Sequence, residues 1–308
     1  MNSEISIVTT LYKSAPYIKI FYSRIVNELK KLSLSYDIVI VNDGSPDESL
    51  DLALEIQKQD PCVVVIDLSR NFGHHKAIIE GLAFAKGARI FLIDCDLEEP
   101  PEIFHAFNER FNVGDCDVVY GVQSSRKGRL FERVSGRYFY ALFNYLSDTK
   151  VPKDATIARM MSKEYVSSLL LFKEESLFLG GIMSAAGYRQ VPLQIQKVDK
   201  GNSTYTLKKK LEATASAITS FSDKPLRIVF YSGIIISAAS FLIAISILLQ
   251  KIFWGVSIPG WAALAISIWF IGGLIILFLG LVGIYVAKIF LQTKLRPATI
   301  VRKIYGKA

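Results

Sequence analysis

Apolar runs alternate with amphipathic stretches along the first hundred residues of this chain. Four short apolar runs are typical of buried strands: Ile5–Thr10, Tyr36–Val41, Cys62–Leu68 and Arg89–Ile93. The segments between them have helical patterns that end near Leu32, Gln59 and Lys86. Strands that alternate with helices pair in parallel, so the pattern predicts an α/β fold with a doubly wound, mostly parallel sheet.

Polar residues stand where three of these strands end. Asp43 follows the second strand, Ser69-Arg70-Asn71 follows the third, and Asp94 with Asp96 follows the fourth. Ligands of doubly wound sheets bind beyond the carboxyl ends of the strands. We therefore expect these residues to meet in one binding site.

The two carboxylates after the fourth strand suggest the chemistry of that site. Asp94 and Asp96 are one residue apart, so on an extended strand end they point to the same side. Converging carboxylates repel each other unless a cation lies beside them, and hard oxygen ligands suit Mg²⁺ or Mn²⁺ together with substrate phosphates. The alternative is an acidic surface loop that starts a helix at Pro100-Pro101.

Two common nucleotide-binding motifs are absent from the sequence. No G-x-G-x-x-G turn follows the first strand, and no G-x-x-x-x-G-K-[ST] occurs, which argues against a dinucleotide redox enzyme and a P-loop ATPase. His74 and His75 follow Gly73 at a predicted helix start, where a neutral cap or a phosphate contact would fit. We favour a structural role for them.

Two long apolar runs lie near the C-terminus. Hydrophobic residues make up 51% of the 308 residues, and the mean hydropathy is +0.33. Ile228–Leu249 and Trp261–Ile289 are each longer than the roughly 20 residues that a helix needs to cross a bilayer. The pair predicts two transmembrane helices, and the alternative is a pair of buried helices in a soluble domain.

Charges beside the two runs predict their orientation. Cations precede the first run and follow the second: Lys208, Lys209, Lys210, Lys224 and Arg227, then Lys288, Lys294, Arg296, Arg302, Lys303 and Lys307. Only Lys251 is charged between them. The positive-inside rule therefore predicts a multi-pass protein with its catalytic domain and both termini in the cytoplasm. The net charge of +8 suits an anionic membrane surface, and no nucleic-acid-binding motif accompanies it, so we expect no nucleic acid partner.

The composition divides the chain into four parts. Residues 1–203 are predicted to form the cytosolic domain, 204–226 juxtamembrane amphipathic helices, 227–290 the two-helix anchor and 291–308 a basic cytosolic tail. Apolar residues at helical spacing between Tyr205 and Phe221 suit a helix on the membrane surface, and core packing is the alternative.

An ordered series of motifs resembles a family-2 glycosyltransferase, most closely its polyprenyl-phosphate branch of undecaprenyl-phosphate glucosyltransferases and dolichol-phosphate mannose synthases. The series comprises Val8-Thr9-Thr10-Leu11-Tyr12, Val41-Asn42-Asp43-Gly44-Ser45, Ser69-Arg70-Asn71-Phe72-Gly73, Asp94-Cys95-Asp96-Leu97, Pro100-Pro101-Glu102 and Ser220-Phe221-Ser222 with Pro225-Leu226. The resemblance implies a GT-A-type fold, a nucleotide-sugar donor, Mg²⁺ or Mn²⁺ as cofactor, a lipid phosphate acceptor and a bacterial inner membrane.

The resemblance also implies roles on the donor side. Asp43 would hold the nucleotide base or ribose, and the Ser69-Arg70-Asn71 run would bind the donor. Asp94 would contact the nucleotide and help to hold the metal, and Asp96 would ligate it. Glu98 stands where the family commonly has Gln near the metal, and is a third candidate ligand.

The acceptor side is implied by a basic loop. Arg126, Arg129 and Arg133 would meet the lipid phosphate, where Arg forms bidentate hydrogen bonds, and a solvated loop is the alternative. Arg126 and Arg129 are assigned to catalysis with the two aspartates. Arg159 and Ser203 are further candidate substrate-binding residues in segments that resemble the family.

One departure from the family pattern bears on the acceptor. Ile157 stands two residues before Arg159, where the family usually has an acidic residue regarded as a candidate base. A phosphate monoester has a second pKa of about 6, so it is already anionic at neutral pH. A sugar hydroxyl would need a general base. The isoleucine therefore favours a phosphate acceptor.

The predicted function is the inverting transfer of a sugar, expected to be UDP-linked, to polyprenyl (undecaprenyl) phosphate for cell-surface polysaccharide or O-antigen modification. One alternative is transfer to a sugar hydroxyl of a lipid-linked glycan. Another is a non-catalytic membrane scaffold or flippase partner. Membrane lipid is an expected partner, and a homo-oligomer stays open.

Overall fold

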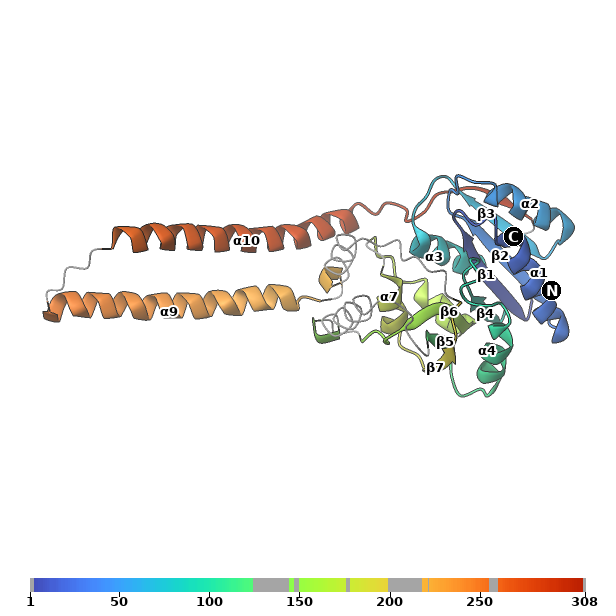
Figure 1. Cartoon of the computed structure of the whole chain (residues 1–308), viewed down its shortest axis with the longest axis horizontal. Coiled ribbons are helices and arrows are strands. Elements are labelled where there is room, and N and C mark those ends of the chain that lie inside the picture. The colour runs from blue at the N-terminus through green and yellow to red at the C-terminus, as the bar shows by residue number, and fades with distance from the viewer. Residues whose placement is uncertain are drawn as a thin grey trace. The chain divides into compact units, whose positions relative to one another are not determined.

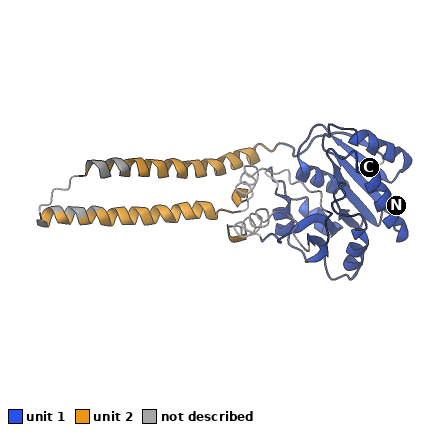
Figure 2. Cartoon of the chain, viewed as in Figure 1, with its two compact units in different colours: residues 1–141, 149–206, 296–308 blue, residues 142–148, 207–295 orange. Residues whose placement is uncertain are grey.

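The computed structural model describes residues 3–123, 144–146, 150–175, 178–198, 218–220, 222–254 and 260–306. The chain forms two compact units (Figure 2). Unit 1 comprises residues 1–141, 149–206 and 296–308, and unit 2 comprises residues 142–148 and 207–295. The residues after the second long helix thus belong with the N-terminal domain, whereas the sequence suggested a separate tail.

An eight-stranded mixed sheet is the centre of unit 1 in the described part of the chain. Its order is β7-β5-β6-β4-β1-β2-β3-β8. The bounds are β1 Ile5–Leu11, β2 Tyr36–Asn42, β3 Val63–Leu68, β4 Arg89–Leu92, β5 Val118–Gln123, β6 Ala155–Ser162, β7 Gln190–Ile195 and β8 Val301–Tyr305. β4, β1, β2 and β3 are parallel neighbours, β6 is antiparallel to β4 and β5, and β8 is antiparallel to β3. The mostly parallel α/β fold predicted from the sequence is confirmed.

Helices cover both faces of this sheet (Figure 1). Their bounds are α1 Ile18–Lys31, α2 Ser49–Gln59, α3 His74–Phe84, α4 Ile103–Asn112, α6 Lys163–Leu169 and α7 Leu179–Ala185. α1 is amphipathic, and it buries Phe21, Ile25 and Leu29 against the sheet. Lys30 and Lys31 lie in its last turn, where cations interact favourably with the helix dipole.

Strand residues alternate between the two layers of helices. Ile5 and Ile7 of β1 belong to the core formed with α1, α2 and α4. Val8 points to the opposite face, where α3 packs. All seven residues of β1 are buried as a result. This explains why the strands read as continuous apolar runs rather than as alternating ones.

α3 packs directly on the sheet because it has a glycine at the point of contact. A Cβ atom at Gly81 would lie 2.7 Å from Val8 Cγ1 and 2.9 Å from Val41 Cγ2. Both distances are below normal van der Waals contact. The first residue of α3, His74, is therefore held close to the ends of β1 and β2.

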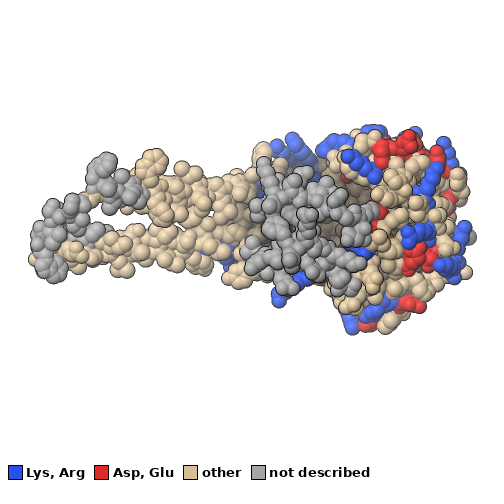
Figure 3. All heavy atoms as spheres, in the orientation of Figure 1, with Lys and Arg blue, Asp and Glu red and all other residues tan. Residues whose placement is uncertain are grey.

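Unit 2 contains two long apolar helices, α9 Lys224–Trp254 and α10 Trp261–Thr293. Lys224–Ile243 and Ser267–Thr293 within them are long and apolar enough to cross a membrane, and neither window is buried. Large apolar side chains such as Phe241, Trp269 and Leu277 are exposed. Figure 3 shows the described parts of both helices free of charged residues along most of their length. Exposed apolar surface of this extent favours membrane-spanning helices over helices buried in a soluble core.

We expect Gly81→Val to destabilise the domain by about 1–3 kcal/mol, because the added side chain overlaps Val8 and Val41. Thermal unfolding of the full-length protein, followed by circular dichroism, measures the effect. Ala83→Val adds the same branched side chain at an exposed position of α3 and is the matched control. Equal melting temperatures for the two variants would show that α3 does not pack this closely.

Candidate active site

The carboxyl ends of β1 and β4 define the location of the candidate site. The chain places β2 and β3 on one side of β1 and β4 on the other. Such a reversal of strand order opens a crevice at the carboxyl edge of the sheet, where ligands of this fold class bind. Thr10 is the penultimate residue of β1, and Asp94 lies two residues after β4.

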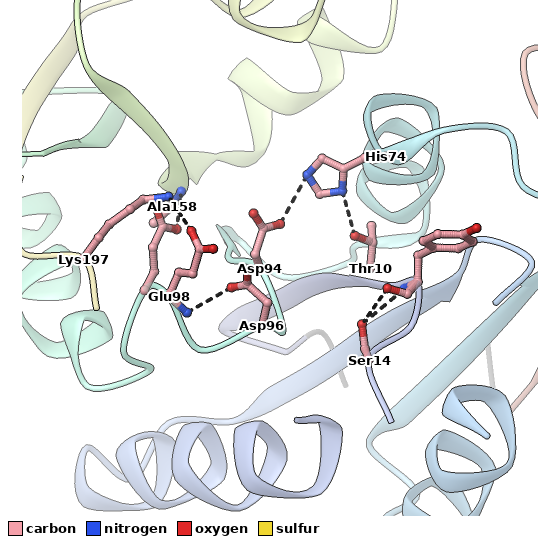
Figure 4. A network of polar contacts seen from close by, with 10 residues as sticks. Thr10, Ser14, His74, Asp94, Asp96, Glu98, Ala158 and Lys197 are labelled. Atoms are coloured by element: carbon pink, nitrogen blue, oxygen red, sulfur yellow. Dashed lines mark hydrogen bonds and ion pairs between the residues drawn. The ribbon is translucent and has the colours of Figure 1, made fainter. Parts of the chain in front are cut away.

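His74 connects the two strand ends. Its Nδ1 atom lies 3.1 Å from Thr10 Oγ1, and its Nε2 atom lies 3.3 Å from Asp94 Oδ1 (Figure 4). Burial and the neighbouring His75 lower the pKa of His74 to about 4, so its ring is neutral at neutral pH. In the tautomer whose Nδ1 accepts from the Thr10 hydroxyl, Nε2–H faces Asp94. His74 therefore contacts Asp94 directly and can orient its side chain. This role is more specific than the structural role that the sequence favoured.

The acidic run after β4 disfavours the ionised form of its first member, Asp94. Burial, followed by repulsion from Glu99 and Asp96, raises the pKa of Asp94 to about 8. Its side chain is 25% exposed, so it is accessible from the crevice. A cation beside Asp94 and Asp96 would oppose both the burial and the repulsion that raise this pKa.

A strained turn presents the second aspartate. Asp96 Oδ1 accepts a hydrogen bond from the backbone N–H of Glu98 at 3.0 Å. Between them, Leu97 has a φ of +63°, a left-handed conformation that costs about 1–2 kcal/mol for a residue with a Cβ. Strain of this kind is concentrated at functional sites.

Lys197 neutralises the other end of the acidic run. Its Nζ lies 3.3 Å from Glu99 Oε1 and 3.7 Å from Glu98 Oε2. Burial lowers the pKa of Lys197, but Glu99 and Glu98 outweigh this effect, so the pKa is raised and the lysine is charged. Glu99 is fully buried and also accepts a hydrogen bond from Ala158 N at 3.0 Å. Figure 4 shows His74 on one side of the Asp94–Asp96 pair and Lys197 on the other.

These residues suit a divalent ion that is completed by substrate. In the described ranges, no group of three or more His, Cys, Asp and Glu side chains is arranged to hold an ion. Mg²⁺ is commonly bound by one or two carboxylates, with substrate phosphates and water supplying the other oxygens. Asp94 and Asp96 fit that donor set, because both offer hard carboxylate oxygens. Glu98, the third predicted ligand, has its carboxylate near Lys197.

The predicted nucleotide-binding residues lie together at the ends of β2 and β3. Asp43 is 2% exposed and accepts hydrogen bonds from Phe72 N at 2.7 Å and Gly73 N at 3.0 Å. Burial raises its pKa, and the two amides and Arg70 oppose the increase. Asp43 therefore fixes the loop that leads into α3.

Gly44 brings the two donor-side loops into contact. It has a φ of +59°, and a Cβ atom there would lie 2.5 Å from both Arg70 C and Asn71 N. Only glycine fits this close approach. The Arg70 guanidinium lies 4.1 Å from the centre of the Phe72 ring and donates to Asn71 O at 3.0 Å. The loop that contains Ser69-Arg70-Asn71 thus lies beside the Asp43-Gly44 turn.

Arg159 lies in the interior of the domain. It is 4% exposed on β6, and its guanidinium is 5.6 Å from the Tyr120 ring centre. Within the residues that the structure describes, its Nε atom has no hydrogen-bond partner. Arg159 follows Ala158, whose N–H binds Glu99, so β6 connects it to the acidic run.

Four predicted site residues lie outside the described residues: Arg126, Arg129, Arg133 and Ser203. Most of the predicted amphipathic segment 204–226 also lies there. The proposed acceptor loop is therefore still a sequence-based prediction.

Sequence reasoning missed the partners that position the acidic run. Thr10 and His74 are 64 residues apart, and Lys197 is far from Glu99 in the chain. No local spacing indicates such pairs. For Thr10 and His74 the only available signal was that each lies at the end of a predicted element, and Lys197 had no such signal because β7 was not predicted.

Comparison with known proteins identifies the family. Residues 6–170 match the family model described as Glycosyl transferase family 2. A Mycobacterium tuberculosis (strain CDC 1551 / Oshkosh) protein with a provisional glycosyltransferase name is 42% identical over 302 residues, which cover 98% of this chain and 88% of that protein. The prophage bactoprenol glucosyl transferase homolog of Escherichia coli (strain K12) is 32% identical over 306 residues, covering 98% and 99%.

A solved structure, mannosyl-3-phosphoglycerate synthase from Rubrobacter xylanophilus, is 15% identical with a TM-score of 0.48 and covers 75% of each chain. The family model and the two relatives together show that this chain belongs to glycosyltransferase family 2. The protein is a glycosyltransferase.

We expect His74→Ala to weaken Mn²⁺ binding in the presence of UDP by about 10- to 100-fold, the usual effect of removing a residue that orients a metal ligand. Titration of the full-length protein by electron paramagnetic resonance measures the affinity. His74→Gln, whose amide can donate to Asp94, should restore part of it. His105→Ala removes an exposed histidine of α4 that pairs with Glu109 and is the control. Equal Mn²⁺ affinity in His74→Ala and His105→Ala would rule out the positioning role.

Proposed function

We propose that this chain transfers a sugar, with inversion, from a nucleotide-sugar to a polyprenyl phosphate at the cytoplasmic face of a bacterial inner membrane. The donor is taken to be UDP-linked, as the family resemblance implies. The product would supply cell-surface polysaccharide or O-antigen modification. The relative from Escherichia coli, named for bactoprenol, supports a polyprenyl acceptor because the two chains match over almost their whole length.

One observation carries the proposal: a carboxylate pair at the crevice of the sheet occurs in the same chain as two exposed apolar helices. The first feature suits a cation and a diphosphate, and the second suits a lipid environment. An enzyme that joins a water-soluble donor to a lipid-borne acceptor needs both.

The path of the chain supports a cytoplasmic domain with a paired crossing. The chain leaves unit 1 before α9 and returns to it after α10, where β8 pairs with β3. Strands of one sheet lie on the same side of a membrane. If α9 and α10 cross, they therefore cross as a pair, and the cations that flank them favour the cytoplasmic side.

The acceptor is the nucleophile in the proposed mechanism. An oxygen of the lipid phosphate attacks the anomeric carbon from the face opposite the leaving nucleoside diphosphate. This single displacement inverts the configuration, so an α-linked donor gives a β-linked lipid phosphate. The acceptor is anionic at neutral pH, and Ile157 at the usual acidic position is compatible with it.

The remaining groups bind and orient the substrates. Asp94, held by His74, and Asp96 would hold a divalent ion, which when bound stabilises negative charge on the diphosphate. Asp43 and the Ser69-Arg70-Asn71 loop would hold the nucleotide. Arg126, Arg129, Arg133 and Ser203 are proposed to hold the acceptor phosphate, with Arg159 supporting the site from β6.

Asp96→Asn should lower turnover by roughly a hundredfold or more, because it removes a charged ligand at the leaving group. The assay supplies full-length protein in vesicles with undecaprenyl phosphate, radiolabelled nucleotide sugars and Mg²⁺ or Mn²⁺, and then extracts the lipid. Asp51→Asn changes an exposed aspartate of α2 and is the matched control.

The products of this assay distinguish the alternatives. A mild-acid-labile glycolipid with one phosphate supports the proposal. Label in a glycan or polymer would indicate a hydroxyl acceptor, and no product with any donor would indicate a non-catalytic protein. Near-normal turnover of Asp96→Asn would refute the metal role.

Arg126→Ala and Arg129→Ala should each raise the acceptor KM roughly tenfold and leave the donor KM unchanged, because each removes a charge-assisted hydrogen bond to the lipid phosphate. Steady-state rates at varied undecaprenyl phosphate measure the effect. Arg189→Ala removes an exposed arginine that pairs with Asp115 and is the control. An unchanged acceptor KM would place the acceptor elsewhere.

A further inference from the structure

The strand that follows the second apolar helix makes an irregular contact with β3. β8 pairs with β3 through Ile304 with Ile66 and Lys303 with Asp67, and then the register shifts so that Val301 faces Leu68. Arg302 is the extra residue at this irregularity. Bulges of this kind commonly redirect a side chain.

Arg302 reaches the start of the donor loop. Its Nη2 atom donates to Ser69 O at 2.6 Å, and its Nη1 atom lies 3.4 Å from Asp67 Oδ2. The backbone N–H of Ser69 donates to Ile300 O at 2.9 Å. Both backbone polar groups of Ser69 are therefore bound by residues that come after α10.

The contact continues beneath the second donor-side loop. Asp67 is buried, and its Oδ1 atom accepts from Asn42 Nδ2 at 2.8 Å. Asn42 Oδ1 in turn accepts from Ser45 N at 3.2 Å. Arg302 is thus at the outer end of a polar network that supports both the Asp43-Gly44 turn and Ser69.

Another cation on the same strand does not take part in this network. Lys303 stacks on the ring of Tyr305, 4.7 Å from its centre. The two adjacent residues have the same charge and similar length, but only Arg302 is hydrogen-bonded to the donor loop in the described structure. A comparison of variants at Arg302 and Lys303 therefore distinguishes a positioning role from the general effect of positive charge on an edge strand.

We propose that Arg302 is a positioning residue for the nucleotide donor, and that β8 holds the Ser69-Arg70-Asn71 loop in its binding conformation. The inference rests on the proposed donor role of that loop. Seven residues, 294–300, join α10 to β8, so the strand that holds the donor loop is tied covalently to the second apolar helix.

The test compares Arg302→Met, Arg302→Lys and Lys303→Met in the full-length protein in vesicles. Affinity for UDP with Mg²⁺ is measured by calorimetry without any acceptor, with GDP used if UDP does not bind the unmodified protein. Donor KM and acceptor KM are measured separately, and thermal unfolding reports on folding. We expect Arg302→Met to weaken nucleotide binding and raise the donor KM roughly tenfold, the loss of charge-assisted hydrogen bonds.

The other measurements make the result specific. The acceptor KM should stay within about twofold, Lys303→Met should behave as the unmodified protein, and Arg302→Lys should be intermediate because it keeps the charge but loses the planar fork. Equal nucleotide affinity in Arg302→Met and Lys303→Met would overturn the inference, as would equal increases in both KM values. If Arg302→Met does not fold, the nucleotide affinity of Arg302→Lys is compared with that of Lys303→Met. This comparison also tests whether Arg302 positions the donor loop.

Failure of the donor role proposed for this site would give a different result. In that case the unmodified protein would bind neither nucleotide. If the unmodified protein binds nucleotide and Arg302→Met binds it equally well, the donor role of the site survives and only the role of Arg302 is lost, while the lipid-extraction assay tests the acceptor separately.

Discussion

Burial and mutual repulsion of the carboxyl groups that follow β4 are the constraint on which the rest of the site depends. Four acidic residues, Asp94, Asp96, Glu98 and Glu99, lie within six positions at the crevice of the sheet. Lys197 lies within 4 Å of the carboxylates of the latter two, whereas burial and repulsion raise the pKa of Asp94 to about 8. The ionised form of Asp94 is therefore favoured when positive charge is added beside it. A divalent ion that arrives with a diphosphate would supply that charge.

The architecture joins this centre to the two apolar helices through a single sheet. β4 and β1 carry the acidic pair and its partners, and β2 and β3 carry the donor loops. The helices α9 and α10 lie between β7 and β8 in sequence, so the sheet is complete only after the apolar hairpin has been made. Contacts between β3 and β8 are among the most distant in the chain, and pairing of this kind forms slowly in folding.

Much of this organisation was predictable from the sequence because its causes are local. The central strands are buried on both faces and so read as apolar runs, and the two long helices expose uninterrupted apolar surface. β8 was not predictable, because as an edge strand it exposes Arg302 and Lys303 and reads as a basic tail. The contacts of His74 and Lys197 were also hidden, because they join residues from distant elements. The candidate site was located from strand ends, while its supporting residues needed the fold.

The position of the metal is the most direct test of the central claim. Anomalous diffraction from crystals of the full-length protein with Mn²⁺ and UDP would locate the ion without reliance on activity. We expect one peak at about 2.0–2.3 Å from carboxylate oxygens of Asp94 and Asp96, with diphosphate oxygens completing its coordination. A diphosphate bound in the crevice without an ion beside these two carboxylates, or an ion held elsewhere in the domain, would contradict it.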